Sequence, residues 1–83
     1  MNGALTAAQL RVLEMLAGAE PNGCTERALT ALGCSVDTLA DIIRCGLASM
    51  SLERMTAGDR TLDVARIKIT DAGRQAIVWT IGR

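Results

Sequence analysis

The side chains best suited to chemistry in this chain of 83 residues are three cysteines, nine carboxylates and nine basic groups. Histidine is absent, so the commonest general base and the commonest metal ligand are both missing. Cys24, Cys34 and Cys45 are widely spaced and form no C-x-x-C pair. No hydroxyl stands beside an evident base. We therefore expect no catalytic constellation, no metal, no cofactor and no enzymatic activity.

The cysteines leave two interpretations open. Without a C-x-x-C pair or a secretory signal, reduced thiols are the default. Cys45 lies near the end of a predicted helix and is expected to be partly exposed, which would allow redox sensing. The commoner role of such residues is that of a small buried hydrophobic side chain.

The start of the chain does not look like an export signal, because it lacks a basic leader and because Arg11 and Glu14 interrupt the apolar run. No window of the sequence is apolar enough for a membrane span. We expect a single-domain cytoplasmic protein with no membrane contact. Trp79 is the only aromatic residue, so a base-stacking platform for single-stranded nucleic acid is excluded.

The charges are unevenly distributed although the formal net charge is zero. Residues 1–59 carry four Arg and seven Asp or Glu, which gives minus three. Residues 60–83 carry five Arg or Lys and two Asp, which gives plus three. This asymmetry allows an anionic partner near the end of the chain, but a neutral whole provides no general attraction to nucleic acid.

The first helix has the clearest start signal. Thr6 and Gln9 form a capping box, and apolar residues then recur at helical spacing until Gly18. This pattern predicts a helix over residues 7–17.

Two short helices follow, and they are joined by a tight turn at Gly33. Thr25 is the expected N-cap of the first and Ser35 that of the second, which ends before Gly46. Their predicted buried faces are Ala28, Leu29 and Leu32 in the first helix and Val36, Leu39, Ala40 and Ile43 in the second. Such a pair is a helix-turn-helix.

A β-hairpin is predicted around Gly58 and Asp59, which suit a two-residue turn. This turn sets the register as Ala57 opposite Arg60, Arg54 opposite Asp63, Leu52 opposite Ala65, and Met50 opposite Ile67. One face is then apolar and is expected to cover the helices; it comprises Ala48, Met50, Leu52, Ala65, Ile67 and Ile69. The outer face near the tip holds Met55, Leu62 and Val64. Two interpretations account for these exposed apolar residues. We favour a bulge that shifts the register or a looser tip; the alternative is that the tip binds a partner.

The segment Arg66–Ile77 changes from strand to helical periodicity at Thr70, which is expected to cap a last helix. The end of this helix is open, because the β-branched run around Val78 would also suit an extended tail. Trp79 either fills the core beside Leu13 or forms an interface with a second copy, giving a homodimer.

Helix, helix-turn-helix, hairpin and closing helix in this order resemble a winged helix-turn-helix domain. At residue level the second half is similar to the MarR-like (multiple-antibiotic-resistance-regulator) family. The resemblance rests on residues 39–47, on Asp59 and Arg60 at the hairpin tip, and on Ile69–Arg74. It extends over about residues 5–77. The chain departs from the family in lacking long terminal dimerisation helices and in having a reading helix that is not basic.

The resemblance implies a single α+β domain over residues 1–83, a three-helix bundle with a two-stranded wing and a short C-terminal helix. It also implies double-stranded DNA as the ligand and a role as a small transcriptional regulator. The candidate DNA-binding residues are Thr38, Asp41 and Arg44 on the reading helix and Arg54, Arg60, Arg66 and Lys68 on the wing.

A second interpretation remains open, in which the domain has this fold but docks on a protein. The docking surface would be the acidic face of the helix over residues 36–45 or the patch at Met55, Leu62 and Val64. Arg54 also has a structural alternative, an ion pair with Asp63 across the strands.

Overall fold

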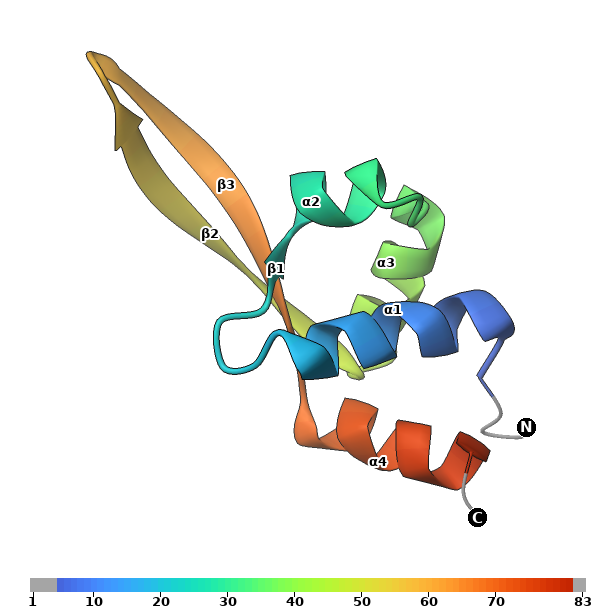
Figure 1. The fold of residues 1–83 in the computed structure, drawn as a ribbon. Coiled ribbons are helices and arrows are strands. Elements are labelled where there is room, and N and C mark those ends of the chain that lie inside the picture. Colours follow the sequence, from blue (N-terminus) through green and yellow to red (C-terminus); the bar gives the residue numbers. More distant parts are fainter. Residues whose placement is uncertain (1–4, 82–83) are drawn as a thin grey trace.

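The computed structural model describes residues 5–81, which form a small α+β fold with four helices and a three-stranded antiparallel sheet (Figure 1). In chain order the elements are α1 (Ala7–Gly18), β1 (Cys24–Thr25), α2 (Glu26–Ala31), α3 (Val36–Arg44), β2 (Ala48–Ala57), β3 (Arg60–Ile69) and α4 (Asp71–Ile81). The strand order is β1-β3-β2, so β3 is central and β2 is an edge strand. The predicted α+β class is confirmed.

The predicted caps of the first three helices are present. The hydroxyl of Thr6 accepts the backbone N–H of Gln9, and the Gln9 side chain accepts the backbone N–H of Thr6, each at 3.0 Å. The hydroxyls of Thr25 and Ser35 each accept a backbone N–H at 3.1 Å from the third residue that follows. Each cap satisfies a donor that the helix leaves free and contributes about 1 kcal/mol.

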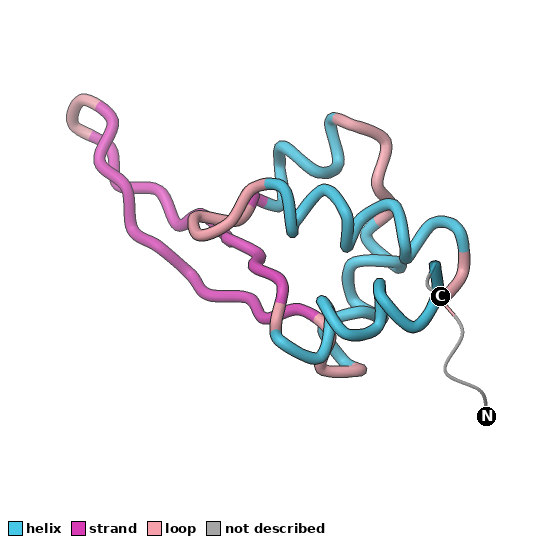
Figure 2. The backbone as a smooth tube through the Cα atoms, turned by 60° about the horizontal axis from the view of Figure 1, so that its bottom comes forward, coloured by secondary structure: helices cyan, strands magenta, loops and turns pink. Residues whose placement is uncertain are grey.

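The core lies where the helices meet one face of the hairpin base, and the rest of the hairpin extends away from the helices (Figure 2). The molecule is accordingly elongated, with principal extents of 50 × 22 × 19 Å. The buried apolar residues are Val12, Leu13, Leu16, Leu29, Leu39, Ile42, Ala48, Ile67 and Ile69.

The prediction of the buried face of α3 was wrong by part of a turn. Leu39 and Ile42 are buried, whereas Val36 is 57% exposed, Ala40 is exposed and Ile43 is only half-buried. Adjacent Ile42 and Ile43 both suit an apolar stripe, and packing of α3 against α1 selects Ile42.

The buried face of α2 is also narrower than predicted. Leu29 is buried, but Ala28 is exposed and Leu32 is 67% exposed. The helix ends at Ala31, so Leu32 forms its C-cap and no longer follows the helical stripe.

The hairpin has the predicted register throughout, from Ala48 opposite Ile69 to Ala57 opposite Arg60. The turn places Gly58 at φ +66°, a conformation that glycine adopts without strain. The bulge favoured from the sequence is wrong, because the pairing is continuous. The apolar face covers the helices only at the hairpin base: beyond it, Leu52 is 69% exposed, since strands of ten residues reach past the helices.

The short strand β1 was not predicted. Cys24 and Thr25 pair with Ile67 and Arg66 of β3. Gly23 precedes them at φ +75°, and a Cβ there would lie 2.3 Å from the carbonyl oxygen of Ile67. The glycine therefore permits the close approach that lets β1 join the sheet.

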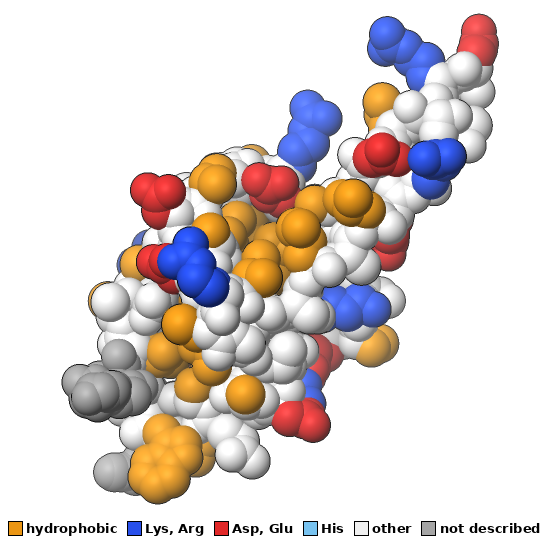
Figure 3. Space-filling model, turned by 180° about the vertical axis from the view of Figure 1, so that it is seen from behind, with side chains coloured by type: hydrophobic (Ala, Val, Ile, Leu, Met, Phe, Trp, Pro, Cys, Tyr) orange, Lys and Arg blue, Asp and Glu red, His pale blue; other side chains and the backbone are white. Residues whose placement is uncertain are grey.

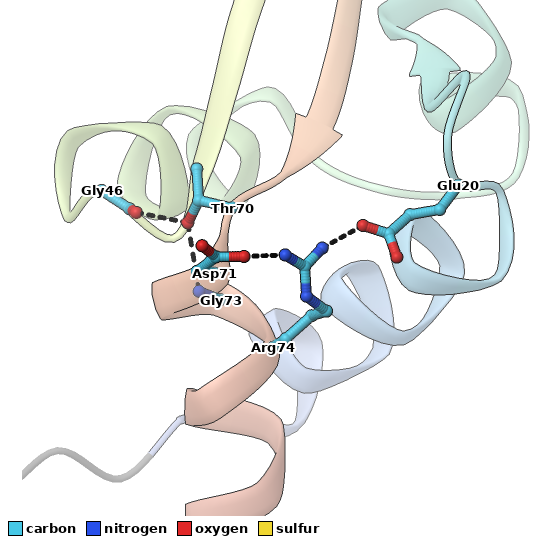
Figure 4. Close-up of polar contacts among 6 residues, drawn as sticks. All are labelled: Glu20, Gly46, Thr70, Asp71, Gly73 and Arg74. Atoms are coloured by element: carbon cyan, nitrogen blue, oxygen red, sulfur yellow. Dashed lines mark hydrogen bonds and ion pairs between the residues drawn. The ribbon is translucent and has the colours of Figure 1, made fainter.

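Thr70 connects the end of the hairpin to the end of α3 (Figure 4). Its hydroxyl donates to the carbonyl of Gly46 at 2.7 Å and accepts the backbone N–H of Gly73 at 3.1 Å. Arg74 forms ion pairs with Glu20 and Asp71 beside this joint. These contacts hold the base of the hairpin in a defined orientation relative to α1 and α3.

Candidate functional site

An open apolar groove of about 380 Å³ lies between α3 and the base of the hairpin. Figure 3 shows hydrophobic side chains gathered there, between the helices and the projecting hairpin. The apolar lining residues are Val36, Leu39, Ala40, Ile43, Met50 and Ile67.

The groove exists because α3 and β2 turn apolar side chains outward beyond the core. Leu39 and Ile67 form its buried floor, while Val36 and Met50 are about half exposed along its sides. Leu52 lies on the same face of β2 as Met50 and extends the apolar surface toward the hairpin tip. A contiguous exposed patch of this kind marks an interaction site more often than scattered apolar residues do.

The charged residues that line the groove are Glu26 and Arg44. Arg44 lines it, but its guanidinium is 3.4 Å from the carboxylate of Asp41, one helical turn away. Glu26 also lines it and forms no ion pair with any residue of the described segment 5–81. Asp37 lies in the first turn of α3 but outside the groove lining. The exposed surface of α3 is thus apolar and acidic.

The candidate DNA-binding residues of α3 are largely engaged with one another or with their own helix. Thr38 is half-buried, and its hydroxyl lies 2.9 Å from that of Ser35, the N-cap. Asp41 and Arg44 form the ion pair described above.

Two of the four hairpin candidates are also in ion pairs. Arg54 lies 3.5 Å from Asp63, which confirms the cross-strand pair expected from the sequence. Arg66 lies 2.9 Å from Glu53 and donates to the carbonyl of Asn22 at 3.4 Å. The Arg66 side chain is only 23% exposed, so its role in holding the loop against β3 is structural.

Arg60 and Lys68 form no ion pair with other residues of the described segment. Arg60 directly follows the turn, so it lies at the tip of the hairpin. Lys68 lies at its base, in a small polar hollow with Asn22, Glu53 and Arg66. Arg83, the last cation of the positive segment, lies outside the described residues.

The seven candidates do not form one surface. Side chains alternate across a strand pair, so Arg54 shares the face of Met50 and the groove, whereas Arg60, Arg66 and Lys68 share the opposite face. Only Arg54 therefore lies on the same side of the hairpin as α3.

The groove was not predicted from the sequence, because Val36 of α3 and Met50 of β2, which line it, were both expected to be buried in the core. The signals available were the adjacent pair Ile42 and Ile43, which allows two rotations of α3, and the length of the hairpin strands. Helices of about two turns are too short to cover strands of ten residues.

Other exposed apolar and thiol groups lie away from the groove. Trp79 is 82% exposed on α4, so the alternative that it fills the core beside Leu13 is wrong. Met55 and Leu62 face one another across the strands near the hairpin tip and are about half exposed. Cys45 is exposed, and Cys24 and Cys34 are half-buried free thiols. Within residues 5–81 no group of three metal-ligating side chains is present.

The chain matches no protein-family model, no curated protein and no solved structure. Every helix within the described segment is too short or too polar to cross a membrane.

Proposed function

We propose that the chain is a winged helix-turn-helix module that docks a protein partner in the groove between α3 and the hairpin. The order of elements and the MarR-like segment Ile69–Arg74 support the fold assignment. The observation that carries the proposed function is the open groove itself, whose walls at Val36, Ala40 and Met50 are apolar and accessible.

The electrostatics of α3 favour protein over DNA as the ligand of this surface. A helix inserted in a major groove approaches phosphates on both sides, and cations normally neutralise them. α3 instead presents Asp37 and Asp41 with Arg44 as its one cation. Exposed ion pairs contribute only about 0–1 kcal/mol, so Arg44 can exchange its partner, but the carboxylates would still repel phosphates.

Double-stranded DNA is the second candidate, and it rests on a different observation. The hairpin projects well beyond the helices and carries Arg60 at its tip with no partner among the described residues. An arginine on such an arm suits the minor groove, and the module would then act as a small transcriptional regulator. Lys68 would add a phosphate contact at the hairpin base.

Two binding measurements on the full chain separate these candidates. A random peptide display library is selected on the wild-type protein, and the selected peptides are then measured on Ala40→Glu, which places a charge in the groove. Gln75→Glu on the exposed face of α4 is the matched control. We expect peptides that bind wild type and Gln75→Glu equally but bind Ala40→Glu at least tenfold more weakly. Equal binding to all three proteins would contradict the proposal.

The DNA candidate is tested by fluorescence anisotropy with a random-sequence duplex at low salt. The proposal predicts no saturable binding. Saturable binding that disappears in the double variant Arg60→Glu, Lys68→Glu would instead identify the wing as a DNA contact. The slope of log affinity against log salt would then be about −1.8 for two phosphate contacts.

A further inference from the structure

We infer that the groove takes an extended polypeptide segment, which adds to the free edge of β2 as a fourth strand. Its alternate apolar side chains enter the groove, and a basic residue faces Glu26. This inference rests on the proposed function and specifies the class of partner. It combines two independent features of the same strand, its unpaired edge and the apolar groove along one of its faces.

The outer edge of β2 has no strand partner within the described segment, and its residues from Ser49 onward are mostly exposed. β2 pairs with β3 alone among the described strands, and β1 occupies part of the other edge of β3. The half of β2 nearest the helices, Ala48–Leu52, contains no proline, charge or bulge. These are the devices that usually protect an edge strand from pairing with another chain.

The backbone groups available for pairing lie at the positions that also border the groove. In a hairpin with a two-residue turn, the first pair, Ala57 and Arg60, is hydrogen-bonded, and the pattern then alternates. Met50 and Leu52 are therefore in non-hydrogen-bonded pairs, and their N–H and C=O groups point away from β3. An added strand would bond to these two residues.

The side chains of an added strand would meet the groove at alternate positions. Met50 lines the groove and Leu52 continues the same face. A strand about 4.8 Å from β2 directs every second side chain to that face, toward Val36 and Ala40 of α3. Strand addition beside a side-chain pocket is a general mode of peptide recognition, in which main-chain bonds give affinity and alternate side chains give specificity.

The charges around the groove indicate a basic partner. Glu26 is a lining residue with no ion-pair partner in the described part of the chain, while the charge of Arg44 is compensated by Asp41. A lysine or arginine in the incoming segment would complement the carboxylate of Glu26.

The periodicity of groove-dependent peptides from the display selection tests the inference, together with two variants at one position. Leu52→Pro removes the outward N–H, and Leu52→Ala removes the side chain but keeps the N–H. Leu52 is 69% exposed and its N–H does not pair with β3, so both variants should fold. We expect apolar residues at every second peptide position, a basic residue, and binding to Leu52→Pro about tenfold weaker than to Leu52→Ala.

Three results would overturn the inference. Peptides with apolar residues at helical spacing, bound equally by both Leu52 variants, would indicate a helix in the groove and leave the proposed function intact. Failure to find any peptide whose binding is weakened by Ala40→Glu would contradict both the strand-addition inference and the proposed function. A dimer in sedimentation equilibrium that Leu52→Pro dissociates would mean that a second copy occupies the edge.

Discussion

Gly73 in the first turn of α4 lies directly against the backbone of Leu47, which follows α3. A Cβ built on Gly73 would be 2.1 Å from the carbonyl oxygen of Leu47 and 2.7 Å from Cγ1 of Ile69. The same carbonyl accepts the backbone N–H of Thr70 at 3.1 Å. The glycine in the segment after the hairpin is therefore required by close packing between two parts of the chain far apart in sequence.

Gly73→Ala should destabilise the protein, although alanine is normally the better helix former. The added methyl group meets a backbone oxygen that cannot move independently, and we expect a loss of about 1–3 kcal/mol in the free energy of unfolding. Gly18→Ala is the control, because a Cβ there would have no described atom within 4 Å other than those of its chain neighbours and its own helix backbone; it should be neutral or stabilise by up to about 1 kcal/mol. Urea denaturation measures both, and equal stability of the two variants would contradict the packing described.

Thr70→Val should cost about 1–2 kcal/mol, because it removes the hydroxyl that bonds both Gly46 and the N–H of Gly73 while keeping the side-chain shape. Thr70→Ser retains the hydroxyl and should lose less. The comparison is made by thermal and urea unfolding. A valine variant as stable as the serine variant would show that the joint does not depend on this hydroxyl.

The rotation of α3 is tested by truncating two apolar side chains on different sides of the helix. Ile42→Ala should lose about 2–5 kcal/mol, because Ile42 is fully buried. Val36→Ala should change the free energy of unfolding by no more than about 0.5 kcal/mol, because Val36 is 57% exposed. If Val36→Ala lowered the free energy of unfolding more than Ile42→Ala, the buried face of α3 would be the one predicted from the sequence. Val36 would then not line the groove.

Arg66 is expected to stabilise the fold modestly and Arg60 not at all. Arg66→Gln breaks the contacts with Glu53 and Asn22, and its partly exposed pair should contribute about 1 kcal/mol or less. Arg60→Gln lacks such contacts among the described residues and serves as the control. If Arg60→Gln lowered the midpoint of urea unfolding as much as Arg66→Gln, Arg66 would have no greater structural role than Arg60.

Local signals in the sequence were sufficient for much of the fold. The capping box at Thr6, the caps at Thr25 and Ser35, and the hairpin register set by Gly58 were all correct, because each depends on neighbouring residues. The chain could not reveal β1 in the same way, since its pairing with β3 depends on the distant contact between Gly23 and Ile67.

The candidate site was harder to predict because it depends on which apolar residues are left over after packing. Ile42 and Ile43 fit a helical stripe equally well, and only the position of α1 distinguishes them. Val36 and Met50 look like core residues in sequence, but the helices are too short to cover them. The hairpin cations were identifiable by type, whereas their separation onto two faces follows from the completed register.

In the proposed function the groove beside α3, rather than a cationic surface, binds the partner. An amide chemical-shift map of the full ¹⁵N-labelled chain tests this, with separate titrations of a groove-dependent peptide and of a random duplex at the same salt concentration. The peptide should shift the amides of Val36, Ala40 and Met50, and the duplex should shift none of them. Saturable shifts on α3 and at Arg60 with the duplex, and none with the peptide, would show that DNA and not a protein segment is the ligand.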